Sequence, residues 1–266
     1  MTEQNPDYQQ RKKFFDQLLT IYGRKPVLEA LQTSDVEVYR LHLAESNKPA
    51  SILSDIEKLA KKKGAEILHH DRKALSFISK NQKQDQGVAV DLKLKGFQDL
   101  DDFLLEIPAP STQHSHTTQP MDIIALDNVT NPQNLGMIIR SACASPITAL
   151  LIPRKGCAKL DSLVIKASAG TLFKAKVIRC DALSTSLEKL KTLGFNVVGL
   201  DVNAAESLGK YHSDSGSVFV LGNETTGMSP EVKSQCNQSV KIPMHNQVES
   251  LNVAVTAALI AFRNAL

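Results

Sequence analysis

The chain has 266 residues, 42% of them hydrophobic, which is long enough for two domains with ordinary cores. No apolar run approaches the roughly 18 residues that a membrane helix needs, and the first residues lack the apolar stretch of a signal peptide. We therefore expect a cytoplasmic protein without a membrane partner, whose net charge of +3 allows a polyanionic ligand without requiring one.

The four cysteines are scattered without a Cys-x-x-Cys pair, which argues against a zinc site and against a disulfide framework. His114 and His116 lie in a stretch rich in Ser, Thr, Gln and Pro, where a linker is the better interpretation than a metal site. We expect no metal.

After a tail of residues 1–20, residues 21–95 alternate helical and strand patterns. The predicted helices are 22–32, 52–64 and about 72–79, and the predicted strands are 39–45, 66–70 and 87–92. The apolar face of the second helix has four members, Ile52, Ile56, Leu59 and Ala60. Its lysines, Lys58, Lys61, Lys62 and Lys63, are predicted to point largely outward. This order predicts a small α/β domain with helices around a short sheet.

Residues 96–120 are interpreted as a linker between two domains. The part from 107 to 120, IPAPSTQHSHTTQP, combines three prolines with small polar residues and no charged side chain.

Residues 121–266 repeat a rhythm of strand and helix. The predicted strands are short and continuously apolar, at 122–127, 147–152, 176–180, 195–201 and 217–222. Such strands are typical of a parallel sheet with helices on both faces. Ligands of these sheets bind at the carboxyl ends of the strands, so the loops after residues 127, 221 and 242 are the candidate sites.

In the first of these loops, apolar residues at 135, 138, 139 and 142 predict a helix that starts near Asn134, with Asn134 as its N-cap. Arg140 is turned away from this apolar stripe. It is either an ordinary exposed arginine or a group that faces a ligand.

The second loop holds Glu224 between Gly222 and Gly227, directly after an apolar strand. Glycines that bracket a carboxylate favour a ligand approached by backbone over a plain turn. In the third loop, Ser250 is the predicted cap of a deeply buried helix over 251–262. Asn252, in its first turn, is expected to bind neighbouring backbone or a ligand.

No G-x-G-x-x-G follows a strand and no P-loop motif is present, which disfavours a dehydrogenase or a P-loop nucleotide site. Three ordered motifs carry a resemblance instead: N-P-x-N-L-G-x-I-I-R at 131–140, L-G-N-E-x-x-G-M at 221–228, and I-P-M…E-S-L-N-V at 242–253. They resemble those of the SpoU, or TrmH-like, RNA ribose methyltransferases of the SPOUT superfamily. Residues 21–92, notably YGRKPVLEAL and DQGVAV, are similar to the ribosomal-protein-like domain that precedes many such enzymes.

The resemblance implies 2′-O-methylation of a ribose in RNA with S-adenosylmethionine as methyl donor, a trefoil knot in residues 121–266, and a homodimer whose sites are completed across the subunit interface. It implies five catalytic residues, Asn134, Arg140, Glu224, Ser250 and Asn252. It implies six cofactor-binding residues, Leu221, Gly222, Ile242, Met244, Leu251 and Asn252. Gly222 is expected to permit close approach of the cofactor, and Glu224 to position Arg140 or the knot loop. Arg140 is either the general base or, because a guanidinium normally stays protonated, an electrostatic stabiliser.

The sequence departs from the family pattern at Asn131, where Asp is usual, at Pro146 and at Thr225, where Gly is common. Asn246 stands where a glycine is common, and Asn tolerates positive φ better than most residues. Asp85 replaces a common histidine in the first domain. The preceding domain favours ribosomal over transfer RNA, and a non-catalytic RNA-binding or ribosome-assembly protein is the competing interpretation.

Overall fold

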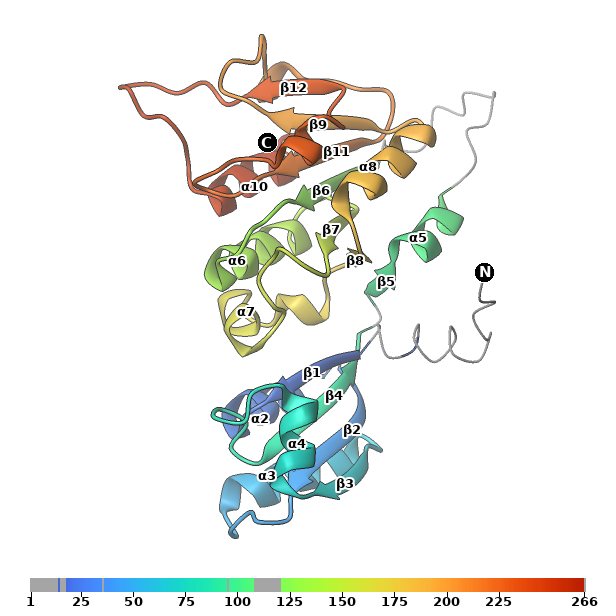
Figure 1. The fold of residues 1–266 in the computed structure, drawn as a ribbon, viewed down its shortest axis with the longest axis vertical. Helices are drawn as coiled ribbons and strands as arrows, with labels where there is room; N and C mark the ends of the chain where they lie inside the picture. The colour runs from blue at the N-terminus through green and yellow to red at the C-terminus, as the bar shows by residue number, and fades with distance from the viewer. Residues whose placement is uncertain (1–13, 15–17, 35, 95, 108–120, 266) are drawn as a thin grey trace. The chain divides into compact units, whose positions relative to one another are not determined.

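A computed structural model describes residues 14, 18–34, 36–94, 96–107 and 121–265 (Figure 1). The described residues form two compact units, one within residues 1–95 with 160–162 and one within residues 96–159 with 163–266. Most of the predicted tail, and residues 108–120 of the predicted linker, lie outside the described residues.

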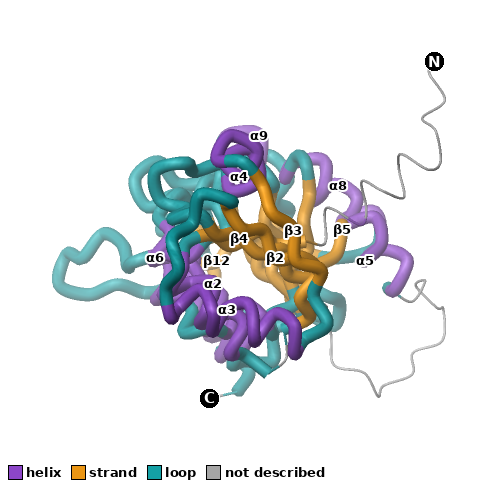
Figure 2. Tube along the Cα trace, turned by 90° about the horizontal axis from the view of Figure 1, so that it is seen from below, coloured by secondary structure: helices purple, strands orange, loops and turns teal. Residues whose placement is uncertain are grey.

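The first unit has a four-stranded mixed sheet in the order β1-β4-β2-β3. Its strands are β1 (Leu18–Tyr22), β2 (Glu37–Ala44), β3 (Glu66–His70) and β4 (Val88–Lys93). Only β2 and β3 pair in parallel. Helices α2 (Arg24–Gln32) and α3 (Ser51–Lys62) cover one face, and α4 (Arg72–Ser79) covers the other (Figure 2). The predicted layering of helices around a short sheet is confirmed.

Helix α3 differs from the prediction in two details. Its buried residues are Leu53, Ile56 and Ala60, so its apolar face is rotated away from Ile52, which is only half-buried. Lys63 does not point outward, because its Nζ donates to the backbone oxygens of Thr33 (2.8 Å) and Val36 (3.2 Å). Those two loop carbonyls attract the ammonium group back towards the chain.

A polar network joins all four strands of the first sheet. Thr20 Oγ1 donates to Asp91 Oδ1 (2.6 Å), and His42 Nε2 lies 3.0 Å from Asp91 Oδ2. His42 Nδ1 lies 2.9 Å from Nε2 of His70 on the edge strand. Burial alone raises the pKa of Asp91, but the hydrogen bonds from His42 and Thr20 prevail and lower it. The carboxylate is therefore kept ionised inside the sheet.

The second unit has an eight-stranded sheet in the order β10-β12-β9-β11-β6-β7-β8-β5, and each neighbouring pair is parallel. The strands are β5 (Phe97–Asp99), β6 (Asp122–Leu126), β7 (Ala149–Pro153), β8 (Val177–Cys180), β9 (Asn196–Leu200), β10 (Glu206–Ser207), β11 (Ser217–Leu221) and β12 (Gln238–Lys241). All residues of β6, β7 and β11 are buried, as expected for strands covered on both faces.

Helices cover both faces of this sheet, as predicted (Figure 1). Helices α5 (Leu100–Glu106), α8 (Leu183–Thr192) and α9 (Pro230–Lys233) pack on one face through a common apolar core. Helices α6 (Pro132–Cys143), α7 (Ser162–Ala167) and α10 (Val253–Phe262) belong to the other, together with the short 3-10 helix η1 (Thr171–Phe173). A second 3-10 helix, η2 (Leu208–Lys210), follows β10. The trefoil knot stays a prediction.

The segment 96–107 differs from the linker predicted over 96–120. Residues 97–99 form β5, which pairs with β8, and Leu100 and Phe103 of α5 enter the core of the second unit. In FQDLDDFLL, apolar residues repeat at helical spacing after a short strand, which indicates structure. The prediction missed this pattern because it grouped these residues with the proline-rich stretch that follows.

Among the described residues, no helix is long and apolar enough to cross a membrane, and no group of three or more His, Cys, Asp and Glu side chains is arranged to hold a metal ion.

Helix α10 is fastened to the sheet at its carboxyl end by a buried ion pair. Arg263 Nη2 lies 2.6 Å from Asp122 Oδ2 at the start of β6, and its guanidinium stacks over the ring of Phe219 at 4.3 Å. Burial raises the pKa of Asp122, and Arg263 opposes this shift. Both side chains are about nine-tenths buried, at 10% and 11% exposed.

Replacing Arg263 by Met should leave the carboxylate of Asp122 buried without its partner, at a cost of about 3–5 kcal/mol in the free energy of unfolding. The change is measured by denaturant unfolding followed by circular dichroism. Lys189→Ala, which breaks an exposed ion pair with Asp101, is the control and should cost no more than about 1 kcal/mol. Equal effects of the two substitutions would contradict a structural role of the buried pair.

Candidate functional site

The loops after β6, β11 and β12 meet at the carboxyl edge of the second sheet. Leu126 and Leu221 end neighbouring parallel strands in register, and the backbone N–H of Asp127 donates to the oxygen of Leu221 (2.8 Å). The carboxylate of Asp127, which is 5% exposed, accepts from the backbone N–H of Ser229 (2.6 Å). The chain leaves β6 towards β7 and β8 and later crosses to β9, so this edge is a topological switch point of the kind where ligands bind.

Residues 222–227 form a tight hairpin. Asn223 and Gly227 exchange backbone hydrogen bonds of 3.0 and 2.9 Å, and Asn223 Oδ1 accepts from the N–H groups of Thr225 and Thr226. A Cβ on Gly222 would lie 2.3 Å from backbone atoms of Gly227 and Met228. The steric demand for glycine at position 222 therefore comes from the closure of this hairpin, whereas the sequence prediction attributed it to the cofactor. The hairpin carries Glu224 near its tip.

Helix α6 begins earlier than predicted. Its N-cap is Asn131, whose side-chain oxygen accepts from the N–H groups of Gln133 (2.8 Å) and Asn134 (3.4 Å), and Pro132 takes the first helical position. The prediction that Asn134 is the cap is wrong. Asn134 instead lies in the first turn with its side chain buried, at 7% exposed, and free to bond elsewhere.

Helix α10 begins later than predicted. Its N-cap is Asn252, whose Oδ1 accepts from the N–H of Ala254 (2.8 Å), so Ser250 is not the cap. Ser250 is exposed in the preceding loop, where Asn246 and Gln247 adopt positive φ of 55° and 60°. The helix is also less buried than predicted, because Val255 and Leu259 are 49% and 41% exposed.

One chain of hydrogen bonds connects the three loops. Asn252 Nδ2 donates to Asn134 Oδ1 (3.1 Å), and Asn134 Nδ2 donates to Glu224 Oε1. Since an amide has one acceptor and one donor group, Asn134 uses both to join a cap to a carboxylate. The other oxygen of Glu224 has no hydrogen-bond partner among the residues that the structure describes. Three of the predicted catalytic residues thus meet in one cluster.

A pocket of about 260 Å³ opens beside this cluster. Its walls are mainly apolar, and its lining includes Leu200, Leu221, Gly222, Val240, Ile242, Met244, Leu251, Val253 and Thr256. Five of the six residues predicted to bind a cofactor line it; Asn252 does not. Glu224 and Ser250 also reach the pocket from its rim. Apolar walls with a few polar groups are the usual make-up of a small-molecule site.

Arg140 stands apart from the pocket. It does not line the cavity and is exposed on α6, six residues beyond Asn134, which corresponds to about 9 Å along the helix axis. Gln133, Met137 and Arg140 form one exposed stripe on this helix. Gly136 lies on another side, where a Cβ would meet Ala167 Cβ at 2.4 Å, so α6 packs closely against α7. Within a single chain the structure does not bring Arg140 to the other predicted residues.

Two residues of the site were not identified from the sequence. Asp127, in the first loop, accepts a hydrogen bond from the backbone N–H of Ser229, which follows the second loop. Asp201 follows β9 and lines the pocket, and its carboxylate accepts from Asn203 N–H (3.0 Å) and from Lys233 Nζ (3.1 Å). The hydrogen bond from Asn203 and the bond from Lys233 lower the pKa of Asp201. Both aspartates directly follow an apolar strand, which is the signal that identifies them.

Comparisons with known proteins agree with this architecture. A family model described as the SpoU rRNA Methylase family matches residues 121–262, and one described as RNA 2′-O ribose methyltransferase substrate binding matches residues 20–97. The YacO protein of Bacillus subtilis, assigned to the TrmH family of tRNA/rRNA methyltransferases, is 33% identical over 242 residues, which cover 91% of this chain and 93% of YacO.

An uncharacterized tRNA/rRNA methyltransferase of Mycolicibacterium vanbaalenii is 31% identical over 252 residues, covering 95% of this chain and 77% of the relative. Among solved structures, the AdoMet-bound rRNA methyltransferase from Sinorhizobium meliloti has a TM-score of 0.62 at 19% identity and covers 99% of this chain and 95% of that one. The SpoU methyltransferase AviRb from Streptomyces viridochromogenes, in complex with AdoMet, has a TM-score of 0.59 at 20% identity, with coverages of 98% and 92%. These two structures share the fold.

Gly222→Ala should force the hairpin open, because the added methyl group would overlap backbone atoms of Gly227 and Met228. We expect a loss of about 1–3 kcal/mol in the free energy of unfolding, as for other overpacked sites. Gly209→Ala is the matched control, since a Cβ at Gly209 meets nothing within 4 Å, and it should stay within about 0.5 kcal/mol of the parent. Thermal and denaturant unfolding measure both; an undisturbed Gly222→Ala protein would refute the steric argument.

Proposed function

The chain belongs to the SpoU rRNA methylase family, and from this premise we propose that it transfers a methyl group from S-adenosylmethionine to a ribose 2′-hydroxyl of RNA. The observation that carries the proposal is the meeting of Asn134, Glu224 and Asn252, from three distant segments, beside an apolar pocket at the carboxyl edge of the sheet. The match of residues 20–97 to the substrate-binding family of 2′-O ribose methyltransferases supports the ribose as acceptor.

The residues that line the pocket suit S-adenosylmethionine. Apolar walls at Leu221, Ile242 and Leu251 fit a purine ring, while the carboxylates of Glu224 and Asp201 suit a ligand that carries a sulfonium and an ammonium group. This cofactor supplies a methyl group that is already activated by the positive charge on sulfur. The residues proposed to hold it are Leu221, Gly222, Ile242, Met244, Leu251 and Asn252, the last through its cap on α10.

The hydrogen-bond chain fixes the position of Glu224. Asn134 occupies one carboxylate oxygen, which leaves the second for a ligand of the pocket that Glu224 lines. Glu224 thereby places a negative charge where an arginine or the ribose hydroxyl is received. Ser250, exposed at the same rim, supplies a hydroxyl that can bond the substrate.

Arg140 acts, in this proposal, in the site of a second copy of the chain. It shares an exposed stripe of α6 with Met137, which is 42% exposed, and α6 packs beside α10. Helix α10 exposes Val255 and Leu259 one turn apart, so the two helices present apolar side chains that a second copy would cover. The guanidinium stays protonated and stabilises the negative charge that develops on the ribose oxygen.

We favour ribosomal RNA over transfer RNA as the substrate, because the matching family is described as an rRNA methylase family. The competing function is a non-catalytic RNA-binding or ribosome-assembly protein. The two differ in the pocket: only the enzyme needs S-adenosylmethionine there.

Calorimetry with S-adenosylmethionine, and transfer of its labelled methyl group to ribosomal RNA, test the function together. We expect saturable binding and 2′-O-methylation that is mapped to specific nucleotides. Arg140→Ala should keep the cofactor affinity and lower methyl transfer by about 100-fold or more, the usual effect of removing one stabiliser of developing charge. Lys191→Ala, a half-buried cation on α8 that does not line the pocket, is the control and should leave both unchanged.

Absence of any binding heat would favour the non-catalytic alternative. Methylation of a base instead of a ribose would refute the acceptor. A Glu224→Ala variant with full methyl-transfer activity would refute the role proposed for this carboxylate.

Light scattering tests the homodimer. The parent protein should have twice the chain mass of 29.1 kDa. Leu259→Asp places a charge on the apolar face of α10 and should give the mass of one chain, with loss of methyl transfer. Leu105→Asp is the matched control, because Leu105 is 85% exposed on α5, and it should stay dimeric and active. A monomeric parent protein with full activity would exclude a site shared between subunits.

A further inference from the structure

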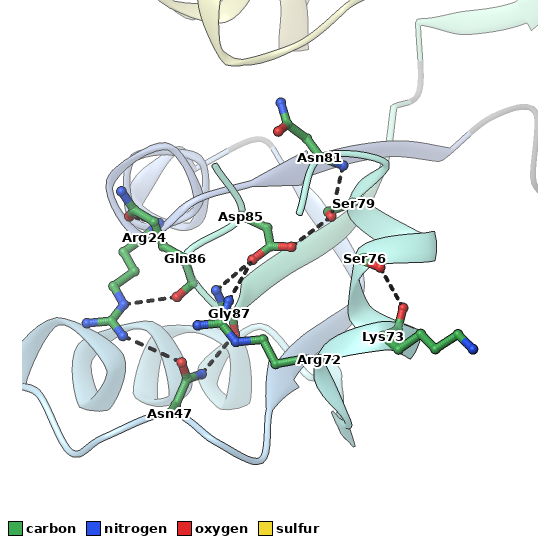
Figure 3. Close-up of polar contacts among 10 residues, drawn as sticks. All are labelled: Arg24, Asn47, Arg72, Lys73, Ser76, Ser79, Asn81, Asp85, Gln86 and Gly87. Atoms are coloured by element: carbon green, nitrogen blue, oxygen red, sulfur yellow. Dashed lines mark hydrogen bonds and ion pairs between the residues drawn. The ribbon is translucent and has the colours of Figure 1, made fainter. Parts of the chain in front are cut away.

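The first unit contains a loop that is held by hydrogen bonds at both of its ends. Between α4 and β4, positive φ occurs at Lys80 (52°), Gln86 (51°) and Gly87 (76°). Asp85, only 1% exposed, accepts from Ser79 Oγ (3.0 Å) and from the backbone N–H of Gly87 (2.9 Å) (Figure 3). A buried carboxylate with two donors ties both ends of the turn, so the orientation of Gln86 is fixed.

This loop orients Arg24, the first residue of α2. The backbone N–H of Arg24 donates to Gln86 Oε1 (3.1 Å), and its Nε donates to the backbone oxygen of Gln86 (3.2 Å). Its Nη2 reaches Asn47 Oδ1 at 3.5 Å, and Asn47 Nδ2 donates to the oxygen of Gly87 (2.8 Å) (Figure 3). Glycine is favoured at position 87 by its φ of 76°, and a Cβ there would also displace the side chain of Asn47, whose Oδ1 would lie 2.1 Å away.

The partners of Arg24 are all neutral. Among the described residues it forms no ion pair, whereas Arg40, Arg154 and Arg263 each bind a carboxylate. Ordering an arginine side chain costs up to about 1.5–2 kcal/mol of rotamer entropy. Here hydrogen bonds to neutral acceptors offset that cost. They orient the guanidinium of Arg24 but leave its charge uncompensated.

A second arginine approaches the same loop. Arg72 Nη1 lies 3.8 Å from Asp85 Oδ1, and the side chain of Arg72 is 55% exposed. Hydrogen bonds through Asn47, Gly87 and Asp85 therefore link the surroundings of the two guanidinium groups (Figure 3). Among the described residues, the printed ion-pair partner of Arg72 is Asp85, which is buried and already accepts two hydrogen bonds.

The segments that carry these arginines are strongly basic. Residues 22–28 and 72–84 contain six cations, Arg24, Lys25, Arg72, Lys73, Lys80 and Lys83, and the acids that flank them are Glu29, Asp71 and the buried Asp85. Oriented guanidinium groups bind phosphate oxygens through paired N–H donors, and surrounding lysines add attraction that does not depend on sequence.

We propose that Arg24 and Arg72, held by the loop of residues 84–87, bind backbone phosphates of the RNA substrate. The inference rests on the proposed function, since it is the match of residues 20–97 to an RNA substrate-binding family that favours RNA over other polyanions. Asp85 acts as a positioning residue: it does not touch RNA but shapes the loop that aims Arg24.

Fluorescence anisotropy with a labelled RNA hairpin that has an unpaired loop tests the proposal on the full chain over a series of salt concentrations. Arg24→Ala should lower the affinity about tenfold, the effect of losing one hydrogen-bonded charge contact, and should reduce the slope of log K against log salt by about one. Lys62→Ala, an exposed cation on α3, is the control for charge alone and should do neither.

Asn47→Ala separates orientation from charge. It removes one acceptor from Arg24 but no charge, so the affinity should fall while the salt slope stays near that of the parent protein. Circular dichroism and S-adenosylmethionine binding by calorimetry show that each variant is folded and that the second unit is intact.

Equal effects of Arg24→Ala and Lys62→Ala would overturn the proposal, and so would a parent protein that does not bind the hairpin. Neither outcome depends on S-adenosylmethionine binding, which calorimetry measures separately. If Arg24→Ala has no effect while the parent protein still binds S-adenosylmethionine and methylates RNA, the phosphate site is refuted and the proposed function stands. If the parent protein binds no S-adenosylmethionine, the proposed function fails.

Discussion

The hydrogen-bond chain from Asn252 through Asn134 to Glu224 is the interaction on which the candidate site depends. It joins residues separated by 118 and 90 positions in the sequence. They meet because parallel strands end at one edge of the sheet, so loops that are distant in sequence become neighbours. Asn252 also caps α10, which means that the start of this helix and the position of the carboxylate are set by the same side chain.

The opposite end of α10 is held as well. The ion pair between Arg263 and Asp122 fastens the last turn to β6, the strand whose following loop leads into α6. With both ends fixed, the register of α10 against α6 is determined, and so is the side on which Val255 and Leu259 are exposed. The fixing of both ends of α10 therefore sets the geometry of the site and also the apolar surface proposed for a second copy.

The sequence allowed the layers and the three loops to be predicted, because apolar strands and helical periodicity are local signals. The caps were misplaced. Asn131 and Asn134 are the same residue type, and only Pro132 at the first helical position marks Asn131 as the cap. In the third loop, Ser250 and Asn252 are both residue types that commonly cap helices, and the structure uses Asn252. The reason for Gly222 was not predictable from its neighbours, because the contact that requires glycine comes from Gly227 and Met228 after the hairpin closes.

Two kinds of charged side chain are distinguished by their partners. Arg263 and Arg40 are ordered by carboxylates, so their charges are neutralised within the fold. Glu224 and Arg24 are held by side-chain amides and, for Arg24, also by a backbone carbonyl, and so are positioned without being neutralised. An amide can orient an ion at little electrostatic cost, and the ion then keeps its attraction for a ligand of opposite charge. On this reasoning, the second unit places a carboxylate for a cationic cofactor or arginine, and the first unit places a guanidinium for phosphate.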